Sequence, residues 1–417
     1  MDILDDLKYR GLIYQASNLE GLRKELKKGR LVLYCGFDPT AESLHIGNLL
    51  HLITLKRFQM VNHQPIILIG GGTGLIGDPS GKKTERPLNS LATVKKWKKE
   101  ITEQVKNIFS ASKNSVIFLD NYEWLGKEKT IDFLRDIGKH FTVPYMLAKE
   151  SIKSRLESGI SFTEFSYMIL QAFDFYHLYQ NYNCELQIGG SDQWGNITAG
   201  VELVKKKLNK EVFGLSTPLV TKASGAKFGK TEGETIWLSP QLTTPYQFYQ
   251  FWIKTDDRDV VQYLKYFTFL SKQEIGNLEK EVQKNPEKRE PQKVLAKEVT
   301  ALVHGKEISL MAEKISQKLF YDDVQNFAEK ELAMIFENIP ATSIQKVRKI
   351  ELAELLMKAG ACSSKRQARE DIENRIIFIN GKLFEDSEAT IKQTDCFYGK
   401  YLLIKKGKKN YYFALWK

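Results

Sequence analysis

The sequence has little cysteine, with four residues in 417, at Cys35, Cys184, Cys362 and Cys396. They lie far apart and form no CxxC pair, so neither a disulfide framework nor a zinc site of the usual spacing is expected. So few cysteines are typical of a protein in a reducing compartment.

Long hydrophobic runs are also missing, since no apolar stretch approaches the roughly 20 residues of a membrane span. The first residues, MDILDDLKYR, are acidic and lack an apolar core, which argues against a signal or transit peptide. We therefore expect a cytoplasmic protein with no membrane segment.

Internal repeats and low-complexity tracts are absent too, and the composition is that of a globular chain, 42% hydrophobic and 27% charged. The length allows two or three domains. The formal net charge is +11, and the lysine-rich stretch KYLLIKKGKK adds to it near the C-terminus. This surplus suits nucleic acid, an acidic membrane surface or a polyphosphate, although a solvated surface explains the charge equally well.

The first half of the chain alternates short apolar runs with helical patterns, which predicts βαβ units and a mostly parallel sheet. The predicted strands are 30–37, 64–71, 115–120 and 184–190. The predicted helices between them are 46–60, 91–109 and 162–181.

The pattern changes from about residue 240 to 335, where strand-like runs disappear. Consecutive helices are predicted at 244–255, 258–267, 271–284 and 291–305. A connector near 342–349 then precedes a small basic domain of two amphipathic helices followed by strands. We predict domains at 1–222, 223–335 and 349–417, with a linker at 336–348.

A glycine-rich stretch, IILIGGGTGLIGDPSG, contains a formal GxGxxG at residues 72–77. A dinucleotide site would need a helix to open within these glycines, but they run into loop residues, Asp78-Pro79-Ser80-Gly81. A dehydrogenase is therefore a minor alternative. We expect a loop that lets a ligand approach the backbone, with Lys82 and Arg86 placed to meet phosphates.

Two short motifs could bind a nucleotide, although each is weak alone. His45-Ile46-Gly47-Asn48 opens a helix, where unpaired N–H groups and the helix dipole attract anions. Lys227 and Lys230, in KFGKT, lie on a glycine-containing loop that could close over a polyphosphate. A structural histidine and an exposed loop are the commoner explanations for such motifs. We expect structural roles for the remaining histidines, His51, His63, His140, His177 and His304.

Together, the two motifs resemble the HIGH and KMSKS signatures of class I aminoacyl-tRNA synthetases. The stretches LYCGFDPTAESLHIGN, GISFTEFSYMILQAFDF and LQIGGSDQWGNITAG resemble the bacterial-type tyrosyl-tRNA synthetase family, as do YRGLIYQASNLEGL, GGGTGLIGDPSGKKTER and GKHFTVPYML. The resemblance covers essentially the whole chain. It implies an α/β fold: a Rossmann-like parallel-sheet catalytic domain, an α-helical domain and a small α+β S4-like domain.

The resemblance also implies a two-step reaction. ATP, accompanied by Mg²⁺, activates L-tyrosine as tyrosyl-adenylate, and tRNA(Tyr) then receives the tyrosyl group. The residues matching catalytic positions are His45, Asn48, Lys82, Arg86, Lys227, Lys230 and Thr231. Asn48 replaces the second histidine of HIGH, so we expect it to orient ATP without contributing charge. No dedicated protein metal site is expected.

Two further sets of residues match the family's substrate contacts. Those expected to bind tyrosine are Tyr34, Asp78, Tyr167, Gln171, Asp174 and Gln187. Those expected to bind ATP are Gly36, Asp38, His45, Gly47, Asn48, Gly190, Asp192, Gln193 and Lys230. Tyr34 and Asp174 match the pair that holds the phenolic hydroxyl.

The C-terminal part resembles an S4-type RNA-binding domain, in which Lys365, Arg366 and Arg369 would face RNA phosphates. Family membership further implies a homodimer, formed around the segment that precedes GKHFTVPYML. Two alternatives stay open: a tryptophanyl-tRNA synthetase, and a non-catalytic RNA-binding protein with a synthetase-like core.

Overall fold

The computed structural model describes residues 2–81, 84, 88–109, 115–157, 159–225, 228–231, 234–320, 326–336, 341–345, 347–407 and 410–417. The chain divides into two compact units. The first comprises residues 1–238 and 256–286, and the second comprises residues 239–255 and 287–417.

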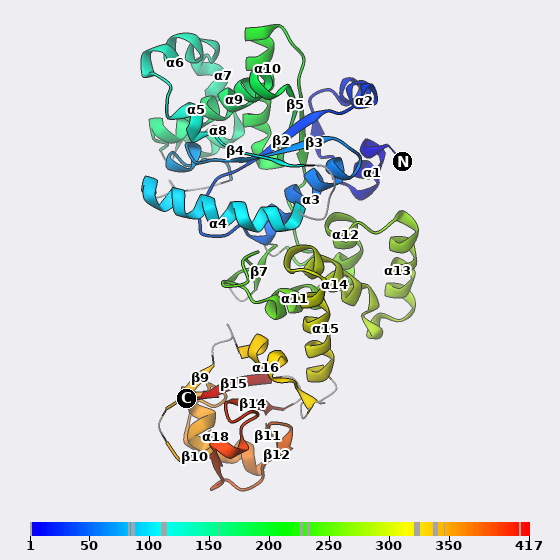
Figure 1. The fold of residues 1–417 in the computed structure, drawn as a ribbon, viewed down its shortest axis with the longest axis vertical. Coiled ribbons are helices and arrows are strands. Elements are labelled where there is room, and N and C mark those ends of the chain that lie inside the picture. The colour runs from blue at the N-terminus through cyan, green and yellow to red at the C-terminus, as the bar shows by residue number, and fades with distance from the viewer. Residues whose placement is uncertain are drawn as a thin grey trace. The chain divides into compact units, whose positions relative to one another are not determined.

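A six-stranded sheet in the order β1-β6-β5-β2-β3-β4 organises the first unit (Figure 1). Its strands are β1 Gln15–Ala16, β2 Val32–Phe37, β3 Gln64–Ile69, β4 Ile117–Asp120, β5 Cys184–Gly190 and β6 Phe213–Thr217. All neighbours pair in parallel except β1, which runs antiparallel to β6. The four predicted strands and the α/β class are confirmed. From β2 the chain moves outward through β3 and β4, and it then returns to β5 on the other side of β2, which creates a topological switch point between β2 and β5.

Helices cover both faces of this sheet, as the completely buried strand β3 requires. In Figure 1, α3 (Ile46–Met60) and α4 (Leu91–Phe109) lie on one side, and α9 (Phe162–Tyr182) and α10 (Trp194–Leu208) lie on the other. The three predicted helices are confirmed. The other helices of this unit are α1 Ile3–Arg10, α2 Leu19–Lys28, α5 Tyr122–Leu125, α6 Thr130–Asp136, α7 Val143–Leu147, α8 Glu150–Leu156, α12 Asp257–Phe267 and α13 Lys272–Lys284.

Local signals fix both ends of α9, the helix that carries Asp174. The side chain of Ser161 accepts a hydrogen bond from the backbone N–H of Glu164 at the start. Asn183 ends the helix in the left-handed conformation, with φ 51°. The register of the residues on this helix is therefore set by its own sequence.

The second unit begins with helices and ends with a small α+β part. Its first helices are α11 Pro245–Ile253, α14 Glu290–His304, α15 Lys306–Phe320 and α16 Glu329–Phe336. The four helices predicted after residue 240 are confirmed as α11, α12, α13 and α14, whereas α15 and α16 were not predicted individually. No helix among the described residues combines the length and apolar character needed to cross a bilayer. The cytoplasmic location stays a prediction.

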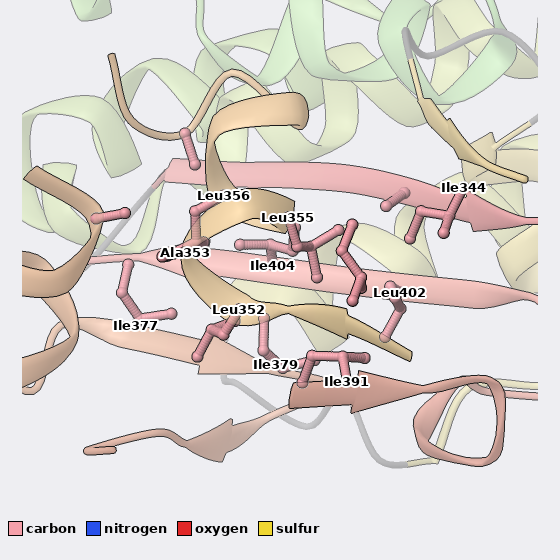
Figure 2. Packing of buried hydrophobic residues seen from close by; sticks show 14 of the residues in the cluster. Ile344, Leu352, Ala353, Leu355, Leu356, Ile377, Ile379, Ile391, Leu402 and Ile404 are labelled. Atoms are coloured by element: carbon pink, nitrogen blue, oxygen red, sulfur yellow. The ribbon is translucent and has the colours of Figure 1, made fainter. Parts of the chain in front are cut away.

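The C-terminal part contains a five-stranded sheet in the order β12-β11-β14-β15-β9 and a separate β10-β13 pair. These strands are β9 Thr342–Ile344, β10 Lys349–Glu351, β11 Ile377–Ile379, β12 Lys382–Leu383, β13 Thr390–Lys392, β14 Tyr401–Lys406 and β15 Asn410–Trp416. Two helices, α17 Leu352–Lys358 and α18 Lys365–Glu373, accompany them. Figure 2 shows leucines of α17 packed against isoleucines of β11 and β14 in one core.

Among the described residues of the predicted linker 336–348, the structure contains a strand, β9, which the sequence did not predict. This strand runs parallel to β15, with Thr342 opposite Ala414 and Ile344 opposite Trp416. Ile344 is buried in the core of the small domain, which explains why the segment joins the sheet. Three residues are too few to show a strand period in the sequence. The predicted domain boundaries stay predictions.

Candidate active site

Residues that were predicted to bind tyrosine lie at the switch point between β2 and β5. Tyr34 on β2 lies directly opposite Gln187 on β5. Gly36 is exposed, and a Cβ there would meet no atom within 4 Å. Ligands of open α/β sheets bind at this place, outside the carboxyl ends of the strands.

Three buried polar atoms here have no hydrogen-bond partner among the described residues: the Tyr34 hydroxyl, Gln171 Oε1 and Gln187 Oε1. Tyr34 is 1% exposed, and its ring meets Phe175 of α9 edge-on at 5.3 Å. Buried groups of this kind cost free energy unless a partner satisfies them. The arrangement therefore fits a polar ligand.

Asp174 is the charged group of this pocket, and it is 2% exposed. Its Oδ1 accepts a hydrogen bond from Trp124 Nε1 at 2.8 Å, and its Oδ2 accepts one from Asn121 Nδ2 at 2.9 Å. Burial raises the pKa of Asp174 to about 8, against the lowering effect of these two hydrogen bonds. Burial and the nearby Asp174 charge also hold the pKa of Tyr34 well above its usual value.

A hydrogen-bonded chain links Asp174 to the glycine-rich loop and to α9. Asn121 Nδ2 also donates to Thr73 Oγ1 at 2.9 Å, and the Thr73 hydroxyl donates to Asp38 Oδ1 at 2.7 Å. The Tyr167 hydroxyl donates to Asp38 Oδ2 at 2.7 Å. Asp38 was predicted to bind ATP, and Tyr167 was predicted to bind the substrate tyrosine. The structure joins these two side chains by a hydrogen bond.

Sequence reasoning missed Thr73, Asn121 and Trp124. One signal was available for Asn121, because it directly follows a predicted strand and so lies at the same sheet edge as Tyr34 and Gln187.

The loop after β5 meets the glycine-rich loop after β3. Gln193 Nε2 donates to Asp78 Oδ2 at 2.5 Å, and the Ser80 N–H donates to Asp78 Oδ1 at 2.9 Å. Burial, with the Asp78 charge, raises the pKa of Asp192. A Cβ at Gly190 would lie 2.4 Å from Asp192 Oδ1, so a larger residue there would displace the Asp192 carboxylate.

Within the glycine-rich loop itself, the only helical element is a 3-10 turn, Thr73–Leu75, and residues 76–81 are irregular. The helix that a dinucleotide site requires is therefore absent from this fully described stretch.

His45 and Asn48 cap the start of α3 reciprocally. His45 Nδ1 accepts a hydrogen bond from the Gly47 N–H at 3.1 Å, and Asn48 Oδ1 accepts one from the His45 N–H at 3.1 Å. Because Nδ1 accepts, a neutral His45 ring carries its proton on Nε2 and can donate from that atom. His45 is exposed, so an incoming phosphate can reach it.

The described part of the KFGKT loop lies against the start of α3. The Ile236 N–H donates to the Gly229 carbonyl at 3.0 Å, and the Ile46 N–H donates to the Ile236 carbonyl at 3.0 Å. Gly229 has φ 80°, and a Cβ there would lie 2.6 Å from Ile46 Cγ2. The structure therefore brings together two motifs that are far apart in the sequence.

Several predicted catalytic residues lie outside the described residues, namely Lys82, Arg86 and Lys227. For Lys230 and Thr231 the structure describes the backbone, which forms strand β7 (Lys230–Thr231) paired with β8 (Glu234–Thr235). Among the described residues, no group of three or more His, Cys, Asp or Glu side chains is arranged to hold a metal ion.

The predicted RNA-binding residues are carried by α18 and are exposed. Lys365 pairs with Glu351 at 3.2 Å, Arg366 with Glu370 at 3.0 Å, and Arg369 with Glu388 at 3.1 Å. Such surface pairs are weak, so a polyanion could replace the carboxylates.

Comparison with known proteins supplies the family. Residues 26–321 match the family described as "tRNA synthetases class I (W and Y)", and residues 331–414 match the "Tyrosine--tRNA ligase SYY-like C-terminal domain". The chain is 55% identical over 415 residues to the tyrosine–tRNA ligase of Bacillus caldotenax, covering 99% of both proteins. It is 51% identical over 420 residues to tyrosine–tRNA ligase 1 of Bacillus subtilis, covering all of both.

Solved structures agree with this result. A C-terminally truncated mitochondrial tyrosyl-tRNA synthetase of Aspergillus nidulans superposes with a TM-score of 0.70 at 30% identity, over 76% of this chain and 94% of that one. Tryptophanyl-tRNA synthetase of Plasmodium falciparum shares the fold, with a TM-score of 0.54 at 16% identity, over 79% of this chain and 87% of that one. Since the full-length relatives and the C-terminal match both carry the tyrosine label, the chain belongs to the tyrosyl-tRNA synthetase family of class I aminoacyl-tRNA synthetases.

Proposed function

We propose that this chain attaches L-tyrosine to tRNA(Tyr) in two steps, through a tyrosyl-adenylate formed from ATP. The observation that carries the proposal is the buried hydroxyl of Tyr34, which has no hydrogen-bond partner among the described residues, beside the buried carboxylate of Asp174. A phenolic hydroxyl placed between them donates to Asp174 and accepts from Tyr34, which satisfies both groups.

The same geometry explains selection against phenylalanine. Without a hydroxyl, phenylalanine leaves Tyr34 and Asp174 buried with part of their hydrogen-bonding capacity unused. A site built to bond a substrate hydroxyl rejects the analogue that lacks it, and tyrosyl-tRNA synthetases are the standard example of this selectivity. The chain Tyr167–Asp38 and the Asp78 carboxylate offer negative charge for the ammonium of tyrosine.

In the first step, the tyrosine carboxylate attacks the α-phosphate of ATP, and pyrophosphate leaves. No protein nucleophile is needed, so the enzyme acts by positioning and by neutralising the charge that develops on the phosphates. His45 Nε2, the N–H groups at the start of α3, and the lysines of KFGKT would serve the phosphates, and Mg²⁺ would accompany ATP. Lys82 and Arg86 would contact the phosphates from the segment that follows the glycine-rich loop.

In the second step, the terminal ribose hydroxyl of tRNA attacks the tyrosyl carbonyl and displaces AMP. The basic residues of α18 would position the RNA. We also propose a homodimer, because large apolar side chains are exposed on the segment 131–162, where Phe162 is 77% exposed. The other exposed apolar residues of this segment are Ile131, Leu134, Val143, Leu147 and Leu156.

ATP–pyrophosphate exchange with purified protein tests the proposal, with tyrosine, phenylalanine, tryptophan or no amino acid supplied. Exchange with tyrosine alone supports it. Exchange with tryptophan would instead indicate a tryptophanyl-tRNA synthetase. A folded sample that binds tRNA but shows no exchange with any amino acid would support a non-catalytic RNA-binding protein. Tyr34→Phe serves as the matched variant, and it is expected to reduce the preference for tyrosine over phenylalanine.

A further inference from the structure

His177, taken from the sequence as a structural residue, is stacked on a tryptophan of the tyrosine pocket. The rings of His177 and Trp124 have centroids 4.2 Å apart and planes inclined by 13°. The N–H of the same indole donates to Asp174 Oδ1 at 2.8 Å. His177 follows Asp174 by three residues on α9, so the two side chains lie on one side of the helix.

One helix thus carries both the carboxylate that receives the indole N–H and the flat ring that fixes the plane of the indole. Phe173 meets His177 edge-on at 6.4 Å, with planes inclined by 60°, and so limits how the imidazole can turn. The Trp124 side chain is buried, but burial alone does not select the rotation that points Nε1 at Oδ1.

The direction of this N–H matters because hydrogen bonds weaken steeply with misalignment. A buried carboxylate that loses a donor binds its proton more tightly. A protonated Asp174 is a poorer acceptor for a phenolic hydroxyl. A misplaced Trp124 therefore weakens the binding of tyrosine without affecting the binding of ATP.

We propose that His177 is a positioning residue for tyrosine selectivity, which holds the Trp124 N–H on Asp174 by stacking on the indole. The proposal rests on the proposed function of the pocket. Burial lowers the pKa of the imidazole, so the ring is neutral at neutral pH and acts through its shape.

The test replaces the ring in two ways and measures ATP–pyrophosphate exchange. His177→Leu removes the flat surface and is expected to raise the KM for tyrosine about tenfold, equivalent to about 1.4 kcal/mol. The preference for tyrosine over phenylalanine should fall by a similar factor, and the KM for ATP should change less than about twofold. His177→Phe restores a flat ring. It should return the KM for tyrosine and the preference for tyrosine over phenylalanine to near the values of the unmodified protein. A general packing defect would not raise the KM for tyrosine while leaving the KM for ATP nearly unchanged, and His177→Phe would not reverse it.

A matched control is Tyr179→Leu, because Tyr179 also lies on α9 and is partly buried against the same hydrophobic core. It should leave the tyrosine KM unchanged. His177→Gln provides a second variant without the ring if the leucine variant does not fold, as judged by thermal unfolding.

Two outcomes overturn the proposal: an unchanged tyrosine KM in folded His177→Leu or His177→Gln, and failure of folded His177→Phe to rescue. If the unmodified protein shows no tyrosine-dependent exchange, the proposed function fails instead, and the two failures are therefore distinguishable.

Discussion

Removing the Trp124 N–H, by Trp124→Phe, gives the sharpest test of how hydrogen bonding favours the ionised form of Asp174 against the effect of burial. The phenyl ring keeps most of the packing but cannot donate to Oδ1, which receives the N–H at 2.8 Å. A hydrogen bond to a charged group contributes about 1.5–3 kcal/mol, which corresponds to about one to two pKa units. The pKa of Asp174, raised by burial to about 8, should therefore rise further.

The sign of the effect follows from the acceptor role. Ionised Asp174 is the stronger acceptor for the phenolic hydroxyl, so the KM for tyrosine should fall as pH rises through about 8 in the unmodified protein. In Trp124→Phe the same fall should occur at higher pH. At pH 7.5 the KM should be higher by about tenfold for each unit of pKa change.

The assay is ATP–pyrophosphate exchange between pH 6.5 and 9, with tyrosine varied at saturating ATP. Both proteins receive the same substrate, so ionisation of the tyrosine amino group cancels in the comparison. Trp97→Phe, on α4, controls for loss of an indole elsewhere. Coincident pH profiles for Trp124→Phe and the unmodified protein would refute the reasoning, as would an equal rise in the KM for ATP.

Further predictions concern three other positions. Burial raises the pKa of Asp174 above its ordinary 3.8, so this group lowers the stability of the ligand-free protein as pH rises from about 4 to about 8. Asp174→Asn should therefore unfold at a higher temperature than the unmodified protein at pH 8, lose that advantage near pH 4, and lose selectivity for tyrosine. Gly229→Ala should lower kcat of exchange at least tenfold with little change in the tyrosine KM, because φ 80° and the Ile46 contact oppose a Cβ; single-turnover kinetics would reveal the effect. Phe162→Glu should shift sedimentation from dimer towards monomer, and an unchanged sedimentation coefficient would place the interface elsewhere.

Much of the fold could be predicted because its elements carry strong local patterns. β3 is a nearly continuous apolar run, and α9 has a capping serine and a terminal asparagine. The HIGN and KFGKT motifs could be paired only through family resemblance, since nothing local to either shows that Gly229 packs on Ile46.

Other features depend on contacts between distant segments, which periodicity does not encode. Asp38 was assigned to ATP through the family resemblance, and no local pattern shows that its carboxylate accepts a hydrogen bond from Tyr167, 129 residues later. The raised pKa of Asp174 arises from burial among several segments, and so do its bonds to Asn121 and Trp124. β9 was missed because it becomes a strand only when β15 lies beside it.

The late position of β15 has a consequence for synthesis of the chain. Because β15 lies between β14 and β9, both neighbours leave the ribosome before the strand that joins them. Until then, β14 pairs with β11 alone and presents an unpaired edge that can template pairing with another chain. A chain interrupted before Asn410 would keep this edge of β14 open, although the pocket around Tyr34 would already be complete. We therefore expect late truncations to aggregate through the small domain while the catalytic sheet remains intact.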